Sequence, residues 1–338
     1  MPAIVTLGEC LIDFVATEAG LPLRAVPSFV RAAGGAPANV AVCVARQGVS
    51  SGFVGAFGRD AFGAYLHDLL LCEGVDCGQS QIVDAPTALA FVSLGADGER
   101  EFLFYRDHAA DLMLDGAGLD AAYIATAHVL HIGSLSLTGA AARAATHCAI
   151  ACARAAGVTI SYDPNLRPDL WSDRETMRAA ALAVFEAATI VKINEDELHF
   201  LSGTADIEEG ITRLVALGPP IVIVTLGRAG CQYRWHGHTG VIPGYPVATI
   251  DTTGAGDGFV AGLLVSLASH PTGHDRDLAG MPGDEVAECL VWANATAALT
   301  TTARGAIPAL PTRAAVGALI AKGSTDSHTR VATTSTPR

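Results

Sequence analysis

The segment Asp251–Asp257 holds the residues whose types and spacing suggest chemistry most directly. It reads Asp-Thr-Thr-Gly-Ala-Gly-Asp and lies between a short extended stretch and an apolar helical run. Small residues at the start of a helix leave backbone N–H groups uncovered, and that end of the helix carries a partial positive charge. Gly254, Ala255 and Gly256 therefore predict a cradle for an anion such as phosphate.

Asp257, the last residue of this segment, suggests a second function. A carboxylate beside an anion cradle can take a proton from a hydroxyl while the amides stabilise the negative charge that develops. The combination indicates phosphoryl transfer to an alcohol. The alternatives are a tight turn or a dinucleotide-binding Gly-x-Gly-x-x-Gly motif. That motif requires glycine where this chain has Phe259, and it normally lies in the first strand–helix unit of its domain.

The composition is that of a globular protein, because half of the 338 residues are hydrophobic and 16% are charged. A net charge of −13 argues against broad binding to nucleic acid or to anionic membranes. The eight cysteines form no Cys-x-x-Cys motif, and the sequence shows no signal-peptide pattern and no apolar helix of membrane-spanning length. We therefore expect reduced cysteines and a cytoplasmic location.

Apolar strand-like runs alternate with helical runs, which predicts a mostly parallel sheet covered by helices on both faces. The predicted strands are Ala3–Gly8, Gly52–Ala56, His128–Gly133, Val158–Asp163, Thr189–Ile193 and Ile221–Leu226, with a hairpin across Cys231–Ile242. The predicted helices are Ala38–Gln47, Ala61–Glu73, Gly139–Ala156, Arg174–Ala188, Ile207–Leu217 and Gly256–Ser269. Ligands in such folds bind at the carboxyl ends of the strands.

Two stretches, Leu11–Arg31 and Thr87–Arg106, interrupt this alternation and show no helical pattern. The second contains an Asp-Gly pair at 97–98, a hairpin-turn signal, between extended apolar runs. We expect the two stretches to form a small separate sheet. Gly323–Arg338 is rich in Ser and Thr and lacks apolar periodicity, so we expect a disordered tail after a single domain of residues 1–322.

Two separated motifs give a resemblance to a known family. Asp251–Asp257 resembles the C-terminal signature of the ribokinase-like (PfkB) carbohydrate kinases, and Gly34–Asn39 with Gly55–Asp60 resembles their N-terminal signature. The resemblance runs from about Gly8 to Pro311. Within the family the chain is most similar to fructokinases. The segments that carry this closer similarity are Gly8–Asp13, Asp97–Arg100, Phe104–Arg106, Ser161–Arg167 and Asn194–Glu197.

The resemblance implies a ribokinase-like three-layer α/β/α fold in which the two interrupting stretches form a β lid over the substrate cleft. It implies an ATP-dependent sugar kinase, and specifically a fructokinase that makes fructose 6-phosphate. The residues expected to bind the sugar are Asp13, Gly34, Gly35, Asn39, Arg106 and Asp257. Some 2-keto-3-deoxygluconate kinases have tyrosine at the position of Phe104, so the phenylalanine favours a neutral sugar. The alternatives are such an acid-sugar kinase, another sugar or nucleoside kinase, or a non-catalytic sugar-binding regulator.

The resemblance also implies ATP and Mg²⁺ as cofactors, with K⁺ where a monovalent-cation site is present. The residues expected at the transferring phosphoryl group are Gly254, Ala255, Gly256 and Arg167, with Asp257 as the base. The residues expected at the nucleotide are Asn165, Lys192, Asn194, Thr225, Gly227, Gly254, Gly256 and Asn294. Glu197 is expected to organise Mg²⁺ through water. Asp251 and Thr253 are expected at the monovalent cation.

Some of these positions also fit purely structural roles. Asn194 and Glu197 have the spacing of a helix-capping pair, which is compatible with the metal role. Arg106 fits an exposed charge at a sheet edge, and Asn294 fits a solvated helical residue. A lid sheet would leave an apolar side exposed unless it met a partner, so we expect a homodimer through the lid, with a small-molecule sugar as the other partner.

Overall fold

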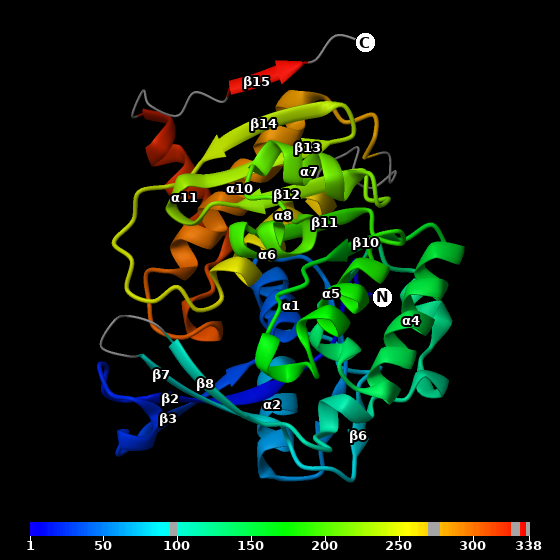
Figure 1. Ribbon diagram of the computed structural model, residues 1–338, viewed down its shortest axis with the longest axis vertical. Helices are drawn as coiled ribbons and strands as arrows, with labels where there is room; N and C mark the ends of the chain where they lie inside the picture. Colours follow the sequence, from blue (N-terminus) through cyan, green and yellow to red (C-terminus); the bar gives the residue numbers. More distant parts are fainter. Residues whose placement is uncertain (95–99, 270–277, 326–331, 336–338) are drawn as a thin grey trace.

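The computed structural model describes residues 1–94, 100–269, 278–325 and 332–335, and it contains a nine-stranded sheet (Figure 1). The strand order is β15-β14-β13-β12-β11-β10-β9-β1-β4, and the six strands from β12 to β4 run parallel, as predicted. The strands are β1 (Ile4–Leu7), β4 (Ser51–Val54), β9 (Val129–Ile132), β10 (Thr159–Tyr162), β11 (Ile190–Asn194), β12 (Ile221–Thr225), β13 (Gly230–Trp235), β14 (His238–Pro243) and β15 (Ala332–Ser335).

Helices cover both faces of this sheet, which confirms the predicted layers. One face is covered by α1 (Ala36–Arg46), α8 (Ala255–Ser269) and α10 (Gly283–Thr300). The other is covered by α3 (Ala121–Ala125), α4 (Ala140–Ala155), α5 (Arg174–Ala183), α6 (Glu195–Ser202) and α7 (Ile207–Val215). The strand β11 is apolar at successive residues because both faces of the sheet are buried. Ile190 packs in the core with α8 and α10, whereas Val191 packs in the core with α4 to α7.

Shorter elements connect and flank these layers. The helix α2 (Ala61–Cys72) packs beside the two-stranded sheet of β5 (Ala56–Gly58) and β6 (Gln81–Val83), and α11 (Arg313–Thr325) packs on α10. Single 3₁₀ turns are η1 (Leu23–Ala25), η2 (Ala110–Met113), η3 (Gly116–Gly118), η4 (Leu135–Leu137), η5 (Pro168–Leu170), η6 (Gly227–Ala229) and η7 (Ile307–Ala309).

Two glycines let α8 approach α10 closely, and α8 carries the start of the predicted anion cradle. A Cβ added at Gly258 would lie 2.5 Å from Thr300 Oγ1, and one at Gly262 would lie 2.6 Å from Thr296 Oγ1. Neither separation is sterically allowed. The glycines therefore fix the depth at which α8 lies in the core, and with it the position of its first turn.

The two stretches that interrupted the alternation form a separate four-stranded sheet, as predicted. Its order is β3 (Phe29–Gly34), β2 (Leu11–Ala16), β7 (Leu89–Leu94) and β8 (Arg100–Tyr105). We call this sheet the lid, and Figure 1 shows it as a layer apart from the nine-stranded sheet. Asp13 pairs with Ala90, which pairs with Phe104, so these three side chains lie on the same face of the lid.

The end of the chain differs from the expected disordered tail. Helix α11 continues to Thr325, and Ala332–Ser335 forms the strand β15, which pairs antiparallel with β14. Without it β14 would be an edge strand with unpaired backbone groups, and the Ala-Thr-Thr-Ser stretch satisfies them. The predicted turn at 97–98 lies outside the described residues. Within the described ranges, no helix has the length and apolarity to cross a membrane.

Candidate active site

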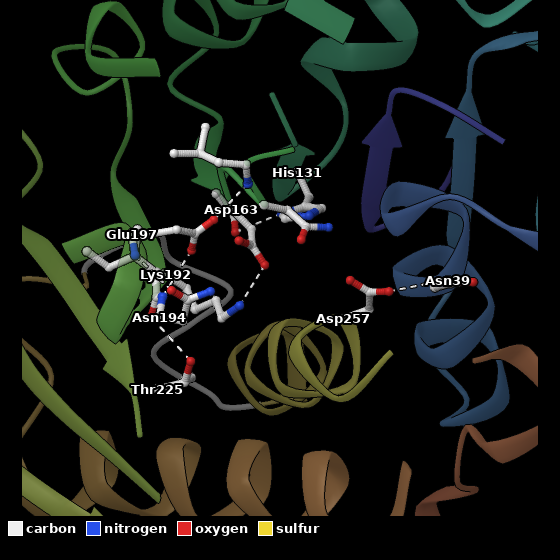
Figure 2. Close-up of polar contacts among 12 residues, drawn as sticks. Asn39, His131, Asp163, Lys192, Asn194, Glu197, Thr225 and Asp257 are labelled. Carbon is white, nitrogen blue, oxygen red and sulfur yellow. Dashed lines mark hydrogen bonds and ion pairs between the residues drawn. The ribbon is translucent and has the colours of Figure 1, made fainter. Parts of the chain in front are cut away.

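Side chains at the carboxyl ends of three neighbouring strands converge on one side of the site. Asp163 directly follows β10, Lys192 lies near the end of β11, and Thr225 ends β12. Figure 2 shows this group opposite the first turn of α8, which carries Asp257, with Asn39 of α1 beyond it. The site therefore lies at the sheet edge where open α/β folds bind ligands.

Asp257 lies in the first turn of α8 and its side chain is buried. Its Oδ2 accepts a hydrogen bond of 2.7 Å from Asn39 Nδ2. Burial raises the pKa of Asp257 to about 6; the Asn39 bond and the charges of Lys192 and Arg167 oppose the rise, and Asp163 adds to it. A carboxylate with this pKa is ionised at neutral pH and basic enough to accept a proton from a hydroxyl.

Two glycines shape the cradle before Asp257. Gly254 has a φ of 78°, which favours glycine, and a Cβ there would lie 2.9 Å from Ala306 Cβ. A Cβ at Gly256 would lie 2.9 Å from Lys192 Nζ, so the ammonium group lies directly beside the first turn of α8. Ala255 N donates to Thr252 O at 3.2 Å, so this amide of the expected cradle is already used. The start of α8 and a fixed cation meet at this point, and together they favour an anion.

Lys192 and Asp163 form a buried ion pair with an Nζ–Oδ2 distance of 2.9 Å. Burial alone would disfavour the ammonium, but the charges of Asp163 and Glu197 outweigh it, and the pKa of Lys192 is raised. Asp163 Oδ1 has no hydrogen-bond partner among the described residues. Asp163 was not singled out from the sequence, although an acid directly after an apolar strand is the signal that could have identified it.

Glu197 and Asn194 form the capping box that their spacing indicated. Asn194 Oδ1 accepts from Glu197 N at 2.8 Å, and Glu197 Oε2 accepts from Asn194 N at 3.0 Å. Glu197 Oε1 also accepts from Leu166 N at 2.7 Å. Burial raises the pKa of Glu197, and the charge of Asp163 adds to this rise. Glu197 thus fastens the loop after β10 to the start of α6.

The loop that Glu197 fastens carries Asn165 and Arg167. Asn165 has a φ of 44°, an uncommon conformation for a residue other than glycine, and Arg167 Nη1 donates to Leu166 O at 3.0 Å. The charge of Arg167 reaches Asp257, whose pKa it lowers. The structure therefore places Arg167 within electrostatic range of Asp257, and its role at the transferring group stays a prediction.

The loops after β12 and before α8 complete the predicted phosphate side. Thr225 Oγ1 donates to Ile193 O at 3.3 Å. Gly227 has a φ of 54°, and a Cβ added there would have no other atom within 4 Å. Asp251 accepts from Thr253 Oγ1 at 2.7 Å and from Gly305 N at 2.9 Å. Asp251 therefore ties the cradle to the turn at Gly305. Within the described ranges, no cluster of three or more His, Cys, Asp or Glu side chains forms a metal site.

The predicted sugar side is built from the turn before α1 and the first strand of the lid. A Cβ on Gly34 would collide with the carboxylate of Asp13, and Gly35 has a φ of 105° with Glu9 O against it. Glu9 Oε1 also accepts from Ala36 N at 3.0 Å. Sequence reasoning did not assign a role to Glu9, which holds the turn that carries both glycines.

Glu9 is fully buried, and this shifts its ionisation. Burial raises the pKa of Glu9 to about 7, with Arg106 opposing the rise and Asp111 adding to it. Glu9 Oε2 has no hydrogen-bond partner among the described residues. A partly protonated acid therefore lies under the predicted sugar-binding turn.

Arg106 is not an exposed edge charge, so that alternative is wrong. It is 6% exposed, and its Nε donates to Asp111 Oδ2 at 2.7 Å. Its Nη1 donates to Thr138 Oγ1 at 2.7 Å and its Nη2 to Leu135 O at 3.0 Å. The guanidinium thus joins the end of the lid to the body of the protein.

Asn294 is buried rather than solvated, which corrects the structural alternative considered from the sequence. Its Nδ2 donates to Ile242 O at 3.1 Å and contacts Cys231 Sγ at 3.6 Å, which holds α10 to the β13–β14 hairpin. A helical asparagine gives no sequence signal for such a contact. The place of Asn294 near the nucleotide base stays a prediction. All eight cysteines are free in the structure.

The chain matches known proteins along most of its length. The family described as pfkB family carbohydrate kinase matches residues 1–313. The chain is 44% identical over 322 residues to Fructokinase-1 of Zea mays, covering 94% of this chain and 98% of the relative.

Solved structures of known proteins are also similar to this chain along most of its length. Fructokinase from Xylella fastidiosa with bound ATP is similar with a TM-score of 0.86 and 34% identity, covering 96% of this chain and 100% of that one. A fructokinase double mutant from Vibrio cholerae O395, in its fructose, ADP and potassium ion bound form, is similar with a TM-score of 0.83 and 32% identity, covering 94% and 98%. The chain therefore belongs to the pfkB family of carbohydrate kinases.

Proposed function

We propose that this protein is a fructokinase that transfers the γ-phosphoryl group of ATP to the 6-hydroxyl of D-fructose. The observation that carries the proposal is the position of Asp257. It is a buried carboxylate with a pKa raised to about 6, in the first turn of a helix that starts beside Lys192. The similarity to fructokinases from Zea mays and Xylella fastidiosa supports fructose as the acceptor.

In the proposed mechanism one side of the site binds the sugar and the other stabilises the transferring phosphoryl group. Asp13, Gly35 and Asn39 position the sugar, and Asp257 accepts the proton of the reacting hydroxyl. The amides of Gly254, Gly256 and Asp257, with the cations of Lys192 and Arg167, stabilise the negative charge on the transferring group. Phosphoryl transfer depends mainly on positioning and on charge stabilisation, which is what this set provides.

The donor set fits a hydrated divalent cation. Both carboxylate oxygens of Glu197 already accept backbone N–H groups, so Glu197 would hold a metal ion through water. Mg²⁺ keeps much of its hydration shell in such sites. When bound with ATP, Mg²⁺ would neutralise charge on the phosphates. Asp251, Thr253 and the carbonyls near Gly305 would hold K⁺, which the Vibrio cholerae structure contains.

The lid supports two further parts of the proposal. It carries Asp13 over the substrate, and closing it would exclude water from the transferring group. Apolar side chains on one face of the lid are exposed, with Val15 at 39% and its pairing partner Val30 at 60%. A second copy of the chain would cover them, so we propose a homodimer through the lid. We also propose a cytoplasmic location, which the free cysteines support.

The competing acceptor within the family is an acid sugar such as 2-keto-3-deoxygluconate. Arg106 would have to pair with its carboxylate, but this guanidinium already pairs with the buried carboxylate of Asp111. This arrangement favours a neutral sugar.

ATP consumption should be measured with D-fructose, with 2-keto-3-deoxygluconate, with D-ribose and without sugar. We expect D-fructose to give the highest kcat/KM and NMR to identify fructose 6-phosphate. A higher kcat/KM for the acid sugar would overturn the assignment. ATP consumption that no sugar stimulates would favour a sugar-binding regulator.

A further inference from the structure

A cavity of about 450 Å³ lies between the end of the lid and the turn η5 after β10. Its walls include Phe102, Phe104 and Arg106 from the lid side and Leu170 and Trp171 from the η5 side. The rings of Phe102 and Phe104 are stacked, with centroids 5.8 Å apart. One side of the cavity is therefore an aromatic surface that belongs to the lid.

The strand register connects this cavity with the sugar side of the site. Phe104 lies in the same row and on the same face of the lid as Asp13, two strands away. Neighbouring strands are about 4.8 Å apart, so the backbones of the two residues are separated by roughly 10 Å. The described residues that line the cavity include neither Asp257 nor the glycine cradle. Phe104 lines the cavity and shares a face of the lid with Asp13, the proposed sugar ligand. An acceptor that reaches from Asp257 past Asp13 along this face would therefore direct its opposite end toward the cavity.

The charge of the cavity is negative. Arg106 contributes a cation, but Asp111 compensates it at an Nε–Oδ2 distance of 2.7 Å. Two further carboxylates line the wall, Asp107 just after β8 and Asp169 within η5. Both residues are exposed, so both carboxylates are in contact with solvent. An anion at this end of the acceptor would meet two like charges that no lining lysine offsets.

We propose that Asp107 and Asp169 are specificity-determining residues that reject acceptors carrying a negative charge at the end opposite the phosphorylated hydroxyl. This inference rests on the proposed function and refines it. The shape of the site would admit the carbon chain of either a neutral or an anionic acceptor. The two carboxylates select the neutral acceptor because they repel the anionic one. Because the carboxylates are exposed, salt should weaken the selection.

The test uses three acceptors that share one carbon frame and the same 6-hydroxyl. D-Fructose is neutral at carbon 1, 2-keto-D-gluconate carries a carboxylate there, and 1-amino-1-deoxy-D-fructose carries an ammonium group. The quantity measured is kcat/KM for each charged acceptor divided by kcat/KM for D-fructose. Comparing ratios within one enzyme cancels any general loss of activity that a variant suffers.

The variants are Asp107→Asn, Asp169→Asn and the double variant, which remove charge with little change in shape. Each removed carboxylate should raise the 2-keto-D-gluconate ratio by about 3- to 10-fold and lower the amino-sugar ratio by a similar factor. The matched control is Asp68→Asn, an exposed acid on α2 whose side chain is 79% exposed. The control should leave both ratios unchanged.

Salt gives a second readout. For the unmodified protein, raising the ionic strength from about 0.05 M to 0.5 M should raise the 2-keto-D-gluconate ratio and lower the amino-sugar ratio, and both changes should be smaller in the double variant.

The outcomes separate this inference from the proposed function. A protein that phosphorylates D-fructose but shows the same ratios in the double variant would contradict the inference alone. A protein that phosphorylates none of the three acceptors would contradict the proposed function. A parallel change of both charged acceptors in the same direction would also overturn the inference, because it would indicate a change of shape rather than of charge.

Discussion

Asn39 and Asp257 are 218 positions apart in the sequence, and the amide of Asn39 donates to the carboxylate of Asp257 at 2.7 Å (Figure 2). The bond joins α1 to the first turn of α8. The sequence interpretation had assigned Asn39 to a sugar hydroxyl. In the structure its donor is directed at the base, while its Oδ1 has no partner among the described residues. Asn39 can thus accept from a sugar hydroxyl and orient the base at once.

Replacing the base gives the first prediction. Asp257→Asn keeps the shape and burial of the side chain but removes its ability to accept a proton. We expect kcat to fall by at least about 10²- to 10⁴-fold, the usual contribution of general acid–base catalysis, while the Kd for ATP changes little. Steady-state kinetics and calorimetric titration with ATP measure the two quantities. A variant with near-normal kcat would reject Asp257 as the base.

Removing the Asn39 donor should move the pH dependence of the reaction. The hydrogen bond from Asn39 lowers the pKa of Asp257, so Asn39→Ala should raise that pKa. The base works as a carboxylate, so activity falls as the pH falls through this pKa. The acidic limb of the kcat/KM profile should therefore shift upward, by on the order of one pH unit. A lower kcat/KM with an unmoved acidic limb would show that Asn39 binds sugar without tuning the base.

The sequence predicted the layers and the start of α8 because both depend on local patterns, whereas anion binding at this helix start stays a prediction. Continuous apolar runs identified the parallel strands, and small residues before an apolar helix identified Gly254 to Gly256. The partners of individual side chains could not be predicted in this way. The ion pair of Lys192 with Asp163 depends on which strands are neighbours in the sheet. The ion pair of Arg106 with Asp111 depends on how the lid packs against the rest of the protein. Both follow from tertiary packing.

The buried pair of Asp163 and Lys192 gives a prediction that separates stability from activity. Asp163→Asn leaves a buried ammonium without its partner, so we expect a loss of about 3–5 kcal/mol in the free energy of unfolding. Asp163→Asn combined with Lys192→Met removes both charges and should recover much of that loss, yet kcat should stay low because the cation beside the cradle is gone. Urea unfolding and steady-state kinetics measure the two effects. A double variant that recovers full activity would exclude a role for the Lys192 charge in catalysis.

Glu9 gives a prediction about stability and pH. Its pKa is raised by burial from 4.5 to about 7, so between these values the folded protein binds more protons than the unfolded chain. Stability therefore decreases as the pH rises through this window. Glu9→Gln keeps an acceptor for Ala36 N and removes the buried charge. We expect the variant to be more stable than the unmodified protein at pH 8, by up to about 3 kcal/mol, with no such gain at pH 4. Thermal unfolding at both pH values, with Asp68→Asn as control, measures this. Equal effects at the two pH values would contradict the assigned ionisation.

The exposed apolar side chains of the lid give the last prediction. Val15 and Val30 are directly paired across β2 and β3 and are 39% and 60% exposed, so they form one apolar surface on the lid. If a second copy covers it, the protein should have the mass of a dimer at micromolar concentration. Val30→Glu places a charge in that contact without disturbing a buried side chain, and it should give a monomer. Val241, an equally apolar residue that is 43% exposed on β14 away from the lid, provides the matched control as Val241→Glu, which should stay dimeric. Sedimentation equilibrium measures all three masses. A monomeric unmodified protein would contradict the dimer itself. A dimer that survives Val30→Glu but not Val241→Glu would place the contact elsewhere than on the lid.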